Sequence, residues 1–185
     1  MLTLHGNNHP VVGHAIVSAD GMIADTRGLM PPRLVNEADW RLFQAALDAA
    51  AIVVLGSAGH RRHPNPGRRR LVFTSSVAAT GPDGGDPLAT LYNPEGLAVA
   101  DALAALRLRD GAVAVTGGRR VFDHFLRQYD EFLLAEVGDF ALPGGTPCFS
   151  AGHPRTVLAA TGLAPVEWSI IDHANSVILT RWSTS

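Results

Sequence analysis

The chain has 185 residues, of which 46% are hydrophobic and only 17% are charged, a composition that indicates a compact globular protein and excludes a disordered one. Its formal net charge of −2 predicts no general attraction to nucleic acid or to anionic membranes. All 15 basic residues are arginines, which excludes a Schiff-base lysine, and the single cysteine excludes an internal disulfide and a cysteine-rich zinc site.

The N-terminal sequence MLTLHGNNHP has no charged segment followed by an apolar run, so we expect no signal peptide. No window reaches the roughly 18 apolar residues that a membrane-spanning helix needs. The chain also has no visible repeat or linker. We therefore expect a cytoplasmic protein in which residues 1–185 form one domain.

Strands and helices are expected to alternate along the chain. A strand at 11–18 precedes a loop rich in Gly and Pro, and Asn36 is placed to cap a helix at 37–50. Further strands are expected at 51–55, 70–75, 112–116 and 131–137, helices at 95–106 and directly after Gly118, and loops at 57–69 and 80–87. Two alternating segments at 163–171 and 176–182 predict an antiparallel hairpin. This order predicts a mostly parallel sheet with helices on both faces.

The most informative segment is VAVTGGRRVFDHFL, residues 113–126. A buried strand runs into Gly117 and Gly118, where no Cβ keeps a ligand away from the backbone, and an amphipathic helix begins at once. The free N–H groups of its first turn suit a phosphate or pyrophosphate, and Arg119 and Arg120 add positive charge. The alternative is a tight strand-to-helix turn that binds nothing, since short glycine motifs also occur by chance.

A second candidate segment is GSAGHRRHPNPGRRRLVFTSS, residues 56–76. It repeats the strand, glycine and short-helix order, and its next strand ends in three hydroxyl residues. Hydroxyls near arginine commonly hold a monoester phosphate such as the 2′-phosphate of NADP. The five arginines between positions 61 and 70 could instead form a nucleic-acid patch or a solvated basic loop. No aromatic residue lies among them to stack on bases, and no carboxylate or thiol lies near His60 and His63 to complete a metal site.

These two segments, together with AIVSADGMIAD at 15–25, resemble the dihydrofolate reductase-like superfamily over about residues 12–149. The resemblance implies an α/β fold with a mostly parallel central sheet, flanking helices and a C-terminal antiparallel β-hairpin. It implies NADPH as cofactor, a cis peptide between the two glycines beneath the pyrophosphate, and backbone contacts from Ile16 and Ile23 to the nicotinamide carboxamide. The residues expected at the cofactor are Ile16, Ile23, Gly56, Ser57, His60, Arg61, Thr74, Ser75, Ser76, Gly117, Gly118, Arg119, Arg120, Val121 and Phe122.

Several positions depart from a true dihydrofolate reductase. This chain has Ser57 where that enzyme has an arginine, Phe122 where a tyrosine is common and Ala135 where a pterin-facing threonine is usual. Arg61 or Arg62 could replace the missing arginine in phosphate binding. The same departures make recognition of a folate harder to support. The sequences SADGMIA, YDE and LPGGTPCF resemble a second branch, the reductase domain of riboflavin biosynthesis. That branch reduces a ribosylaminopyrimidine phosphate with NADPH and tends to be dimeric, and no deaminase motif accompanies it here.

The resemblance implies hydride transfer to a C=N-type bond of a small heterocyclic substrate, with a carboxyl group as proton donor. Glu37 is the first candidate and Asp39 the second, although Glu37 could merely favour the helix dipole. Asp20, Trp40 and Ala135 are expected at the substrate, with Asp20 more suited to shaping its turn, and Arg33 or Arg155 could hold a substrate phosphate. No metal, nucleic acid or membrane is expected, and a homodimer is. The alternatives are a dihydrofolate or dihydropterin reductase and a non-catalytic NADP-binding protein.

Overall fold

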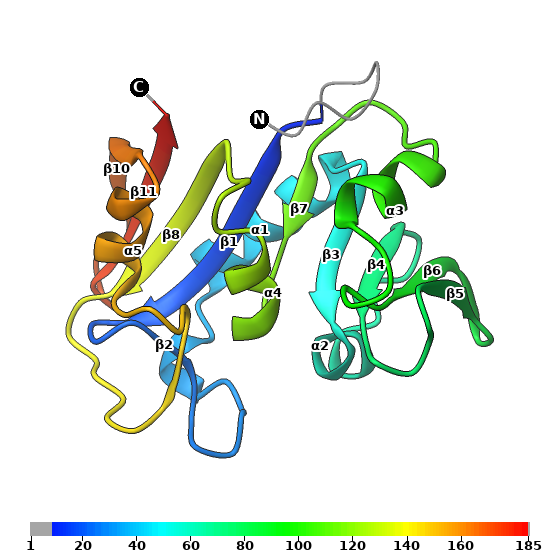
Figure 1. The fold of residues 1–185 in the computed structure, drawn as a ribbon. Coiled ribbons are helices and arrows are strands. Elements are labelled where there is room, and N and C mark those ends of the chain that lie inside the picture. The colour runs from blue at the N-terminus through cyan, green and yellow to red at the C-terminus, as the bar shows by residue number, and fades with distance from the viewer. Residues whose placement is uncertain (1–8, 185) are drawn as a thin grey trace.

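A computed structural model describes residues 9–184, so most of the N-terminal segment considered for a signal peptide lies outside the described residues. Nine strands form one sheet in the order β10-β11-β8-β1-β7-β3-β4-β6-β5 (Figure 1). Their bounds are β1 Val11–Ser18, β3 Ile52–Gly56, β4 Arg70–Phe73, β5 Thr80–Asp83, β6 Asp86–Tyr92, β7 Val113–Val115, β8 Glu131–Val137, β10 Leu163–Asp172 and β11 Val177–Thr184. Two short strands, β2 (Met22–Ala24) and β9 (Thr146–Pro147), pair separately.

The centre of the sheet is parallel and both of its ends are antiparallel. Strands β8, β1, β7, β3, β4 and β6 pair in parallel, whereas β5 pairs antiparallel to β6, and β11 antiparallel to both β8 and β10. Strands β3, β4 and β7 are almost wholly buried, as expected for parallel strands covered on both faces. The predicted fold class and the C-terminal hairpin are therefore confirmed.

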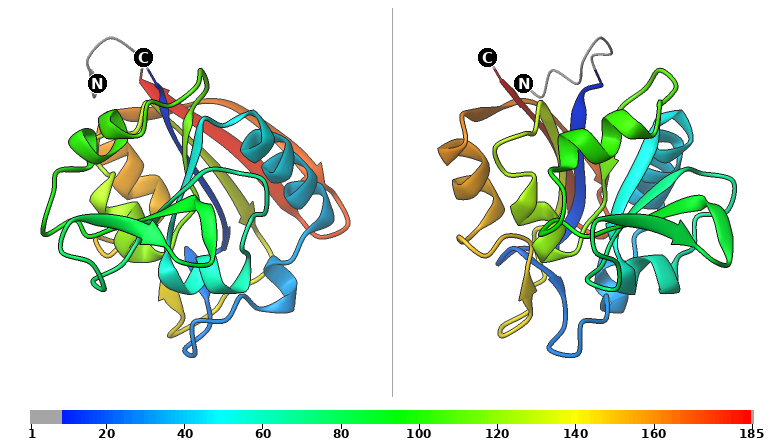
Figure 2. Two further views of the ribbon diagram at one scale, coloured as in Figure 1. Left: turned by 90° about the vertical axis from the view of Figure 1, so that its right-hand side faces the viewer. Right: turned by 45° about the vertical axis from the view of Figure 1, so that its right-hand side comes forward.

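Helices cover both faces of the sheet, as Figure 2 shows. Helices α3 (Val99–Ala105), α4 (Arg119–His124) and α5 (Pro154–Ala160) pack into the largest apolar cluster. Helix α1 (Glu37–Ala49) packs on the opposite face, next to the short 3-10 helix η1 (Pro32–Leu34). The remaining helix, α2 (Ser57–Arg62), directly follows β3.

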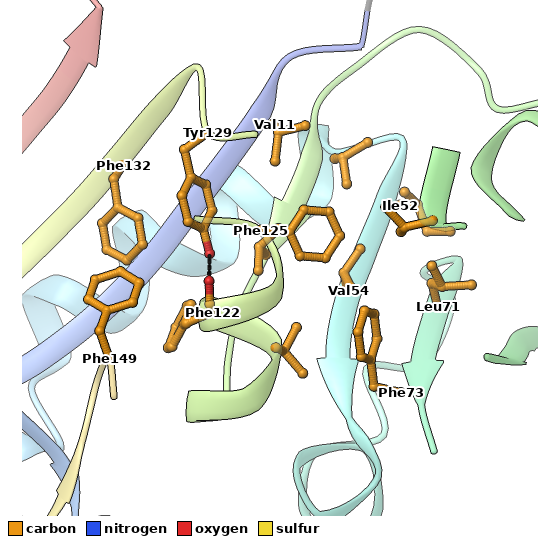
Figure 3. Close-up of a cluster of buried hydrophobic side chains, with 14 of the residues drawn as sticks. Val11, Ile52, Val54, Leu71, Phe73, Phe122, Phe125, Tyr129, Phe132 and Phe149 are labelled. Atoms are coloured by element: carbon orange, nitrogen blue, oxygen red, sulfur yellow. Dashed lines mark hydrogen bonds between the residues drawn. The ribbon is translucent and has the colours of Figure 1, made fainter. Parts of the chain in front are cut away.

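Aromatic rings fix α4 against the sheet (Figure 3). The ring of Phe122 lies 5.7 Å from that of Phe132 and 5.9 Å from that of Phe149. The Tyr129 hydroxyl donates a 3.2 Å hydrogen bond to the Phe122 carbonyl. Strand β1 passes so close beneath these rings that a Cβ on Gly13 would lie 2.2 Å from Phe132. These contacts fix the position of α4, and therefore also that of the turn at residues 117–118, which directly precedes the helix.

The predicted loop at 80–87 is wrong, because this segment forms most of a β-hairpin. Strands β5 and β6 are joined by Gly84 and Gly85, and the Asp83 carboxylate accepts the N–H of Gly85. The prolines and glycines that suggested a loop are compatible with an edge strand, where Pro82 needs no ladder hydrogen bond.

The helix predicted at 95–106 is shorter and begins only at Val99. Gly96 breaks it, since the chain turns there with a hydrogen bond from Gly96 N to Asn93 O and passes against the carbonyl of Ala78. Residues 57–62 form α2, which is the short helix expected after Gly56, so the loop expected at 57–69 is correct only in its second part. Helix α5 and the β2-β9 pair were not predicted.

Candidate active site

Strands β1 and β7 are adjacent in the sheet, and the helices that follow them pack on opposite faces. After β1 the chain reaches α1, and after β7 it enters α4 on the other face. The pairing between these strands ends at Gly13 and Val115, although β1 continues to Ser18. In parallel α/β proteins, ligands bind outside the carboxyl ends of the strands at such a switch point. We therefore take this edge as the candidate site.

The two glycine turns predicted from the sequence meet at this edge. Strands β3 and β7 are adjacent, and the backbone N–H of Gly56 donates a 3.0 Å hydrogen bond to the carbonyl of Gly117. Thr116 N also donates to the carbonyl of Val54 at 2.9 Å. Two turns that are far apart in the sequence, at Gly56 and Gly117, thus form one continuous backbone surface.

The two glycines of the second turn have different reasons to be glycine. Gly117 has a φ of +108°, and a Cβ there would lie 2.8 Å from the Phe122 ring. Gly118 precedes α4, is exposed, and a Cβ there would meet nothing within 4 Å. The expected cis peptide is wrong, since residues 9–184 contain none. Gly117 is therefore required by the fold, whereas the protein itself leaves the space above Gly118 open.

Helix α4 presents its side chains in two directions. Val121 and Phe122 are both 2% exposed and point into the core, so only their backbone groups could contact a ligand. Arg119 and Arg120 are exposed, and neither makes a side-chain hydrogen bond or ion pair with another described residue. The turn thus has two uncommitted positive charges beside the open face of Gly118.

The predicted hydroxyl cluster lies next in the sheet. Strand β4 is paired with β3 and ends at Phe73, so Thr74, Ser75 and Ser76 follow it as a surface turn. Thr74 Oγ1 donates to Ser76 Oγ at 3.0 Å and accepts the Ser76 backbone N–H at 3.1 Å. Hydroxyls arranged in this way present several hydrogen-bonding atoms to one small anion.

The arginine-rich run does not form one basic patch. Arg62 donates to the Gly28 carbonyl at 2.7 Å, Arg68 pairs with Asp48 at 2.6 Å, and the fully buried Arg70 pairs with Asp86 at 2.5 Å. Arg61 is exposed and has no side-chain partner among the described residues. Two of the five arginines thus pair with carboxylates and Arg62 is held by a carbonyl, so the run does not present one continuous set of free charges to a nucleic acid.

The structure distinguishes the two carboxyl groups considered as acids. Asn36 caps α1 as predicted, with its side-chain oxygen accepting from Ala38 N and Asp39 N at 3.1 and 3.0 Å. Glu37, the first candidate, is exposed at the start of the helix. Asp39 is half-buried, and burial raises the pKa of its carboxyl to about 6. A carboxyl with this pKa is partly protonated near neutral pH, as a proton donor must be.

His14 is a further candidate for a functional side chain, and it is not among the residues predicted from the sequence. It lies in β1, is 8% exposed, and burial lowers its pKa to about 4, so the imidazole is neutral at physiological pH. Its ring packs edge-on against the ring of Phe43, with 5.9 Å between the two ring centroids. Phe43 lies one helical turn after Asp39 in α1. The feature of the sequence that could have identified it is a histidine within an otherwise apolar strand.

The other residues expected at the substrate have mainly structural partners. Asp20 accepts hydrogen bonds from Ser18 Oγ at 2.5 Å and Leu142 N at 2.9 Å. Burial would raise its pKa, but these hydrogen bonds outweigh it and hold the pKa below its usual value. Ile16 and Ala135 are register partners in the core, whereas Ile23 is partly buried. Asp20 thus shapes its turn, and Ile16 could reach a ligand only through its backbone.

The two arginines considered for a substrate phosphate are already paired. Arg33 contacts Asp139 at 2.5 Å, and Arg155 contacts Glu136 at 2.7 Å. The bond to Glu136 raises the pKa of Arg155. A phosphate at either position would have to compete with a carboxylate of the protein.

Trp40 is half-exposed and lines a surface hollow of about 330 Å³ between α1 and the segment after α2. Its ring lies 6.4 Å from that of His63. The hollow is lined by Trp40, Gln44, Arg62, His63, Pro64, Asn65, Pro66 and Arg68. Trp40 thus lies at this hollow, whereas its neighbour Asp39 is not among the residues that line it.

Two classes of feature are absent from the part of the chain that the structure describes. No group of three or more His, Cys, Asp or Glu side chains is arranged to hold a metal ion. None of the helices within residues 9–184 is long and apolar enough to cross a membrane.

Comparison by sequence finds no matching family model and no matching curated protein. Comparison of structures finds a riboflavin biosynthesis protein from Shewanella sp. PV-4, with 18% identity, a TM-score of 0.67, and coverage of 95% of this chain and 99% of that one. Dihydrofolate reductase from Enterococcus faecalis, complexed with NADP(H), matches with 17% identity and a TM-score of 0.66 over 94% of this chain and 95% of that one.

A third match is the diaminohydroxyphosphoribosylaminopyrimidine deaminase/5-amino-6-(5-phosphoribosylamino)uracil reductase of Thermotoga maritima, with 16% identity and a TM-score of 0.68. It covers 96% of this chain, which spans only 57% of that protein. At these identities the likeness concerns the fold. The chain therefore has the dihydrofolate reductase-like fold, which it shares with these three proteins.

Proposed function

We propose that the protein is an NADPH-dependent reductase that transfers a hydride to a C=N-type bond of a small heterocycle. One observation carries the proposal. The hydrogen bond from Gly56 to Gly117 joins two glycine turns beside the β1-β7 switch point, where Gly118 is open and arginines are uncommitted. A surface of this kind suits a dinucleotide pyrophosphate. The likeness in fold to proteins named as reductases supports the same reading.

The residues at this edge fit the cofactor. The open face of Gly118 leaves room for a pyrophosphate, with Arg119 and Arg120 beside it. The hydroxyls at 74–76 and the free Arg61 suit the 2′-phosphate. Backbone groups of Ile16 and Ile23 would hold the nicotinamide carboxamide. When bound, NADPH supplies the hydride, and the protein contributes orientation and a proton.

We assign the proton donor to Asp39 rather than Glu37. Burial raises the pKa of Asp39 to about 6, so a useful fraction of this carboxyl carries a proton near neutral pH. Glu37 is exposed at the helix start, where a carboxylate favours the helix dipole. Of the two residues, Asp39 has the environment of an acid.

The proposed substrate is a ribosylaminopyrimidine phosphate or a related heterocycle. Phe122 and Ala135 have no hydroxyl where pterin-reducing relatives commonly have one, which makes a dihydropterin the second choice. We also propose that the protein acts as a cytoplasmic homodimer.

The test is a fluorescence and thermal-shift titration with NADPH and NADH, followed by NADPH oxidation with the riboflavin-pathway pyrimidine and with dihydropterins. We expect NADPH to bind at least tenfold more tightly than NADH, since one or two charged hydrogen bonds to the 2′-phosphate contribute about 1.5–3 kcal/mol each. Equal affinities would contradict the 2′-phosphate assignment. Tight NADPH binding without oxidation by any substrate would instead identify a non-catalytic NADP-binding protein.

A further inference from the structure

The β5-β6 hairpin is tied to the rest of the protein by a histidine–aspartate hydrogen bond and an arginine–aspartate ion pair. His60 of α2 donates from Nε2 to Asp83 at 2.9 Å, and Arg70 of β4 donates to Asp86 at 2.5 Å. Arg70 also donates to the carbonyl of Pro64, which follows α2 in the chain. We call His60, Arg70, Asp83 and Asp86 the hairpin clamp. It connects α2, the segment after α2, β4 and the hairpin.

The members of the clamp are buried to different extents. The Arg70 side chain is completely buried and that of His60 is 14% exposed, whereas the two aspartates are 28% and 30% exposed. The His60 hydrogen bond, with help from the Gly85 N–H, lowers the pKa of Asp83. The Leu88 N–H and Arg70 lower that of Asp86. His60 and Arg70 each stabilise both aspartates, so the four groups act as one electrostatic unit.

His60 has no nitrogen available for a cofactor phosphate. Its Nε2 is bound to Asp83, and its Nδ1 is buried with no hydrogen-bond partner among the described residues. Arg70 is likewise committed, and its Nε is buried without a partner. His60 and Arg70 therefore do not bind the proposed ligand directly. Burial of charged side chains lowers stability unless they are well paired, so their position beneath this edge needs another reason than ligand contact.

The clamp holds together the two segments that would grip the 2′-phosphate. His60 lies one turn after Ser57 and next to Arg61 in the same short helix. Arg70 begins β4, the strand that delivers the hydroxyls at 74–76. The pyrophosphate turn at Gly117 and Gly118 follows β7, and within the described residues none of the side-chain hydrogen bonds or ion pairs of the clamp reaches it. Loosening the clamp should thus disturb one phosphate site and spare the other.

We propose that the hairpin clamp is a positioning network for 2′-phosphate recognition, and that His60 and Asp83 act on cofactor selectivity without touching the cofactor. This inference rests on the proposed NADPH binding. A clamp that merely protected the sheet edge would affect stability and would change the affinities for NADPH and NADH by the same factor. The ratio of the two affinities therefore distinguishes the roles.

The experiment measures the Kd of NADPH and of NADH, together with Tm, for the full chain and its variants. Asp83→Asn and His60→Gln should each weaken NADPH binding about five- to twentyfold and NADH binding less than twofold. The double variant should be no weaker than either single one, because both weaken the same contact between positions 60 and 83. Asp83→Glu keeps the acceptor and should restore most of the NADPH affinity.

Asp110→Asn is the matched control. It removes the same charge from an exposed residue at the opposite end of β7, and should change neither affinity. An Asp83→Asn protein with wild-type NADPH affinity, or with equal losses for both cofactors, overturns the proposal. Failure of the wild-type protein to bind either cofactor overturns the proposed function itself, and this is seen before any variant is made.

Discussion

Gly117 and Phe122 are packed so closely that a Cβ on the glycine would lie 2.8 Å from the ring. The ring is one of the three that fix α4 to the sheet, and Gly117 has a φ of +108°. A Cβ on the neighbouring Gly118 would meet no heavy atom within 4 Å. One glycine of the pair therefore serves the fold, and the other is free to serve a ligand.

Gly118→Ala should separate ligand binding from stability. The added methyl group meets no protein atom and the backbone is outside the left-handed region, so Tm should change by no more than about 2 °C. The same methyl group occupies the space proposed for the pyrophosphate, so the Kd for NADPH should rise about tenfold or more. Isothermal titration calorimetry and a thermal melt measure both quantities. Wild-type affinity in Gly118→Ala would mean that the turn is only structural.

Gly117→Ala is the matched comparison and should behave in the opposite way. The substitution forces an alanine into a positive φ and against the Phe122 ring. Strained backbone of this kind costs on the order of 1–3 kcal/mol, so the free energy of unfolding should fall by about that amount. Urea denaturation measures the change, and an unchanged midpoint would show that the core adapts more readily than its packing suggests.

Asp39→Asn should slow the reaction and leave cofactor binding intact. Loss of a general acid lowers kcat by about 10²–10⁴-fold, and the loss should shrink at low pH, where solvent supplies protons. Glu37→Gln removes an equally charged but exposed carboxyl and should change kcat less than about twofold. NADPH oxidation across pH 5–8 measures both variants. The reverse order of effects would assign the acid to Glu37.

His14 and Asp39 predict opposing dependences of stability on pH. Burial lowers the pKa of His14 to about 4, so the unfolded chain binds its proton from about pH 6.5 downward while the folded protein does not. This contribution to stability is lost as the pH falls. Burial raises the pKa of Asp39 to about 6, so the folded protein binds a proton that the unfolded chain has released. This contribution is lost as the pH rises from about 4 to 6, and in the wild type the two slopes largely cancel.

Single variants should expose each slope. In Asp39→Asn the His14 term is no longer offset by that of Asp39, so stability should increase between about pH 4 and 6.5, by about 2–3 kcal/mol relative to wild type. In His14→Leu the Asp39 term is no longer offset by that of His14, so stability relative to wild type should decrease over about pH 4–6 by a similar amount. Urea denaturation at intervals of pH measures these slopes. Parallel curves for all three proteins would mean that neither group is as desolvated as its position indicates.

The local parts of the site could be predicted from the sequence, and the long-range parts could not. The strand before Gly117, the helix after it and the Asn36 cap depend on residues within a few positions, and all three are confirmed. The partner of Arg70 is 16 residues away, on a hairpin whose strands are rich in residues typical of loops. Sequence spacing likewise could not show that Asp39 is more buried than Glu37, because their exposure depends on how α1 lies on the sheet. Tertiary packing, not local propensity, decides which charges remain free for a ligand.

Arg61 and Arg62 are adjacent, both exposed, and differ in whether their guanidinium groups are committed. Arg62 donates to the Gly28 carbonyl at 2.7 Å, whereas Arg61 has no side-chain partner among residues 9–184. A charged hydrogen bond to phosphate contributes about 1.5–3 kcal/mol, so Arg61→Ala should weaken NADPH binding at least about tenfold and leave NADH binding nearly unchanged. Arg62→Ala removes the same charge from the next position and should alter the NADPH to NADH affinity ratio less than about threefold. Titrating both variants with both cofactors at two salt concentrations separates a direct contact from general attraction, because screening weakens only the latter strongly. An equal loss in the two variants would show that net charge at this turn, and not a specific arginine, determines the preference for NADPH.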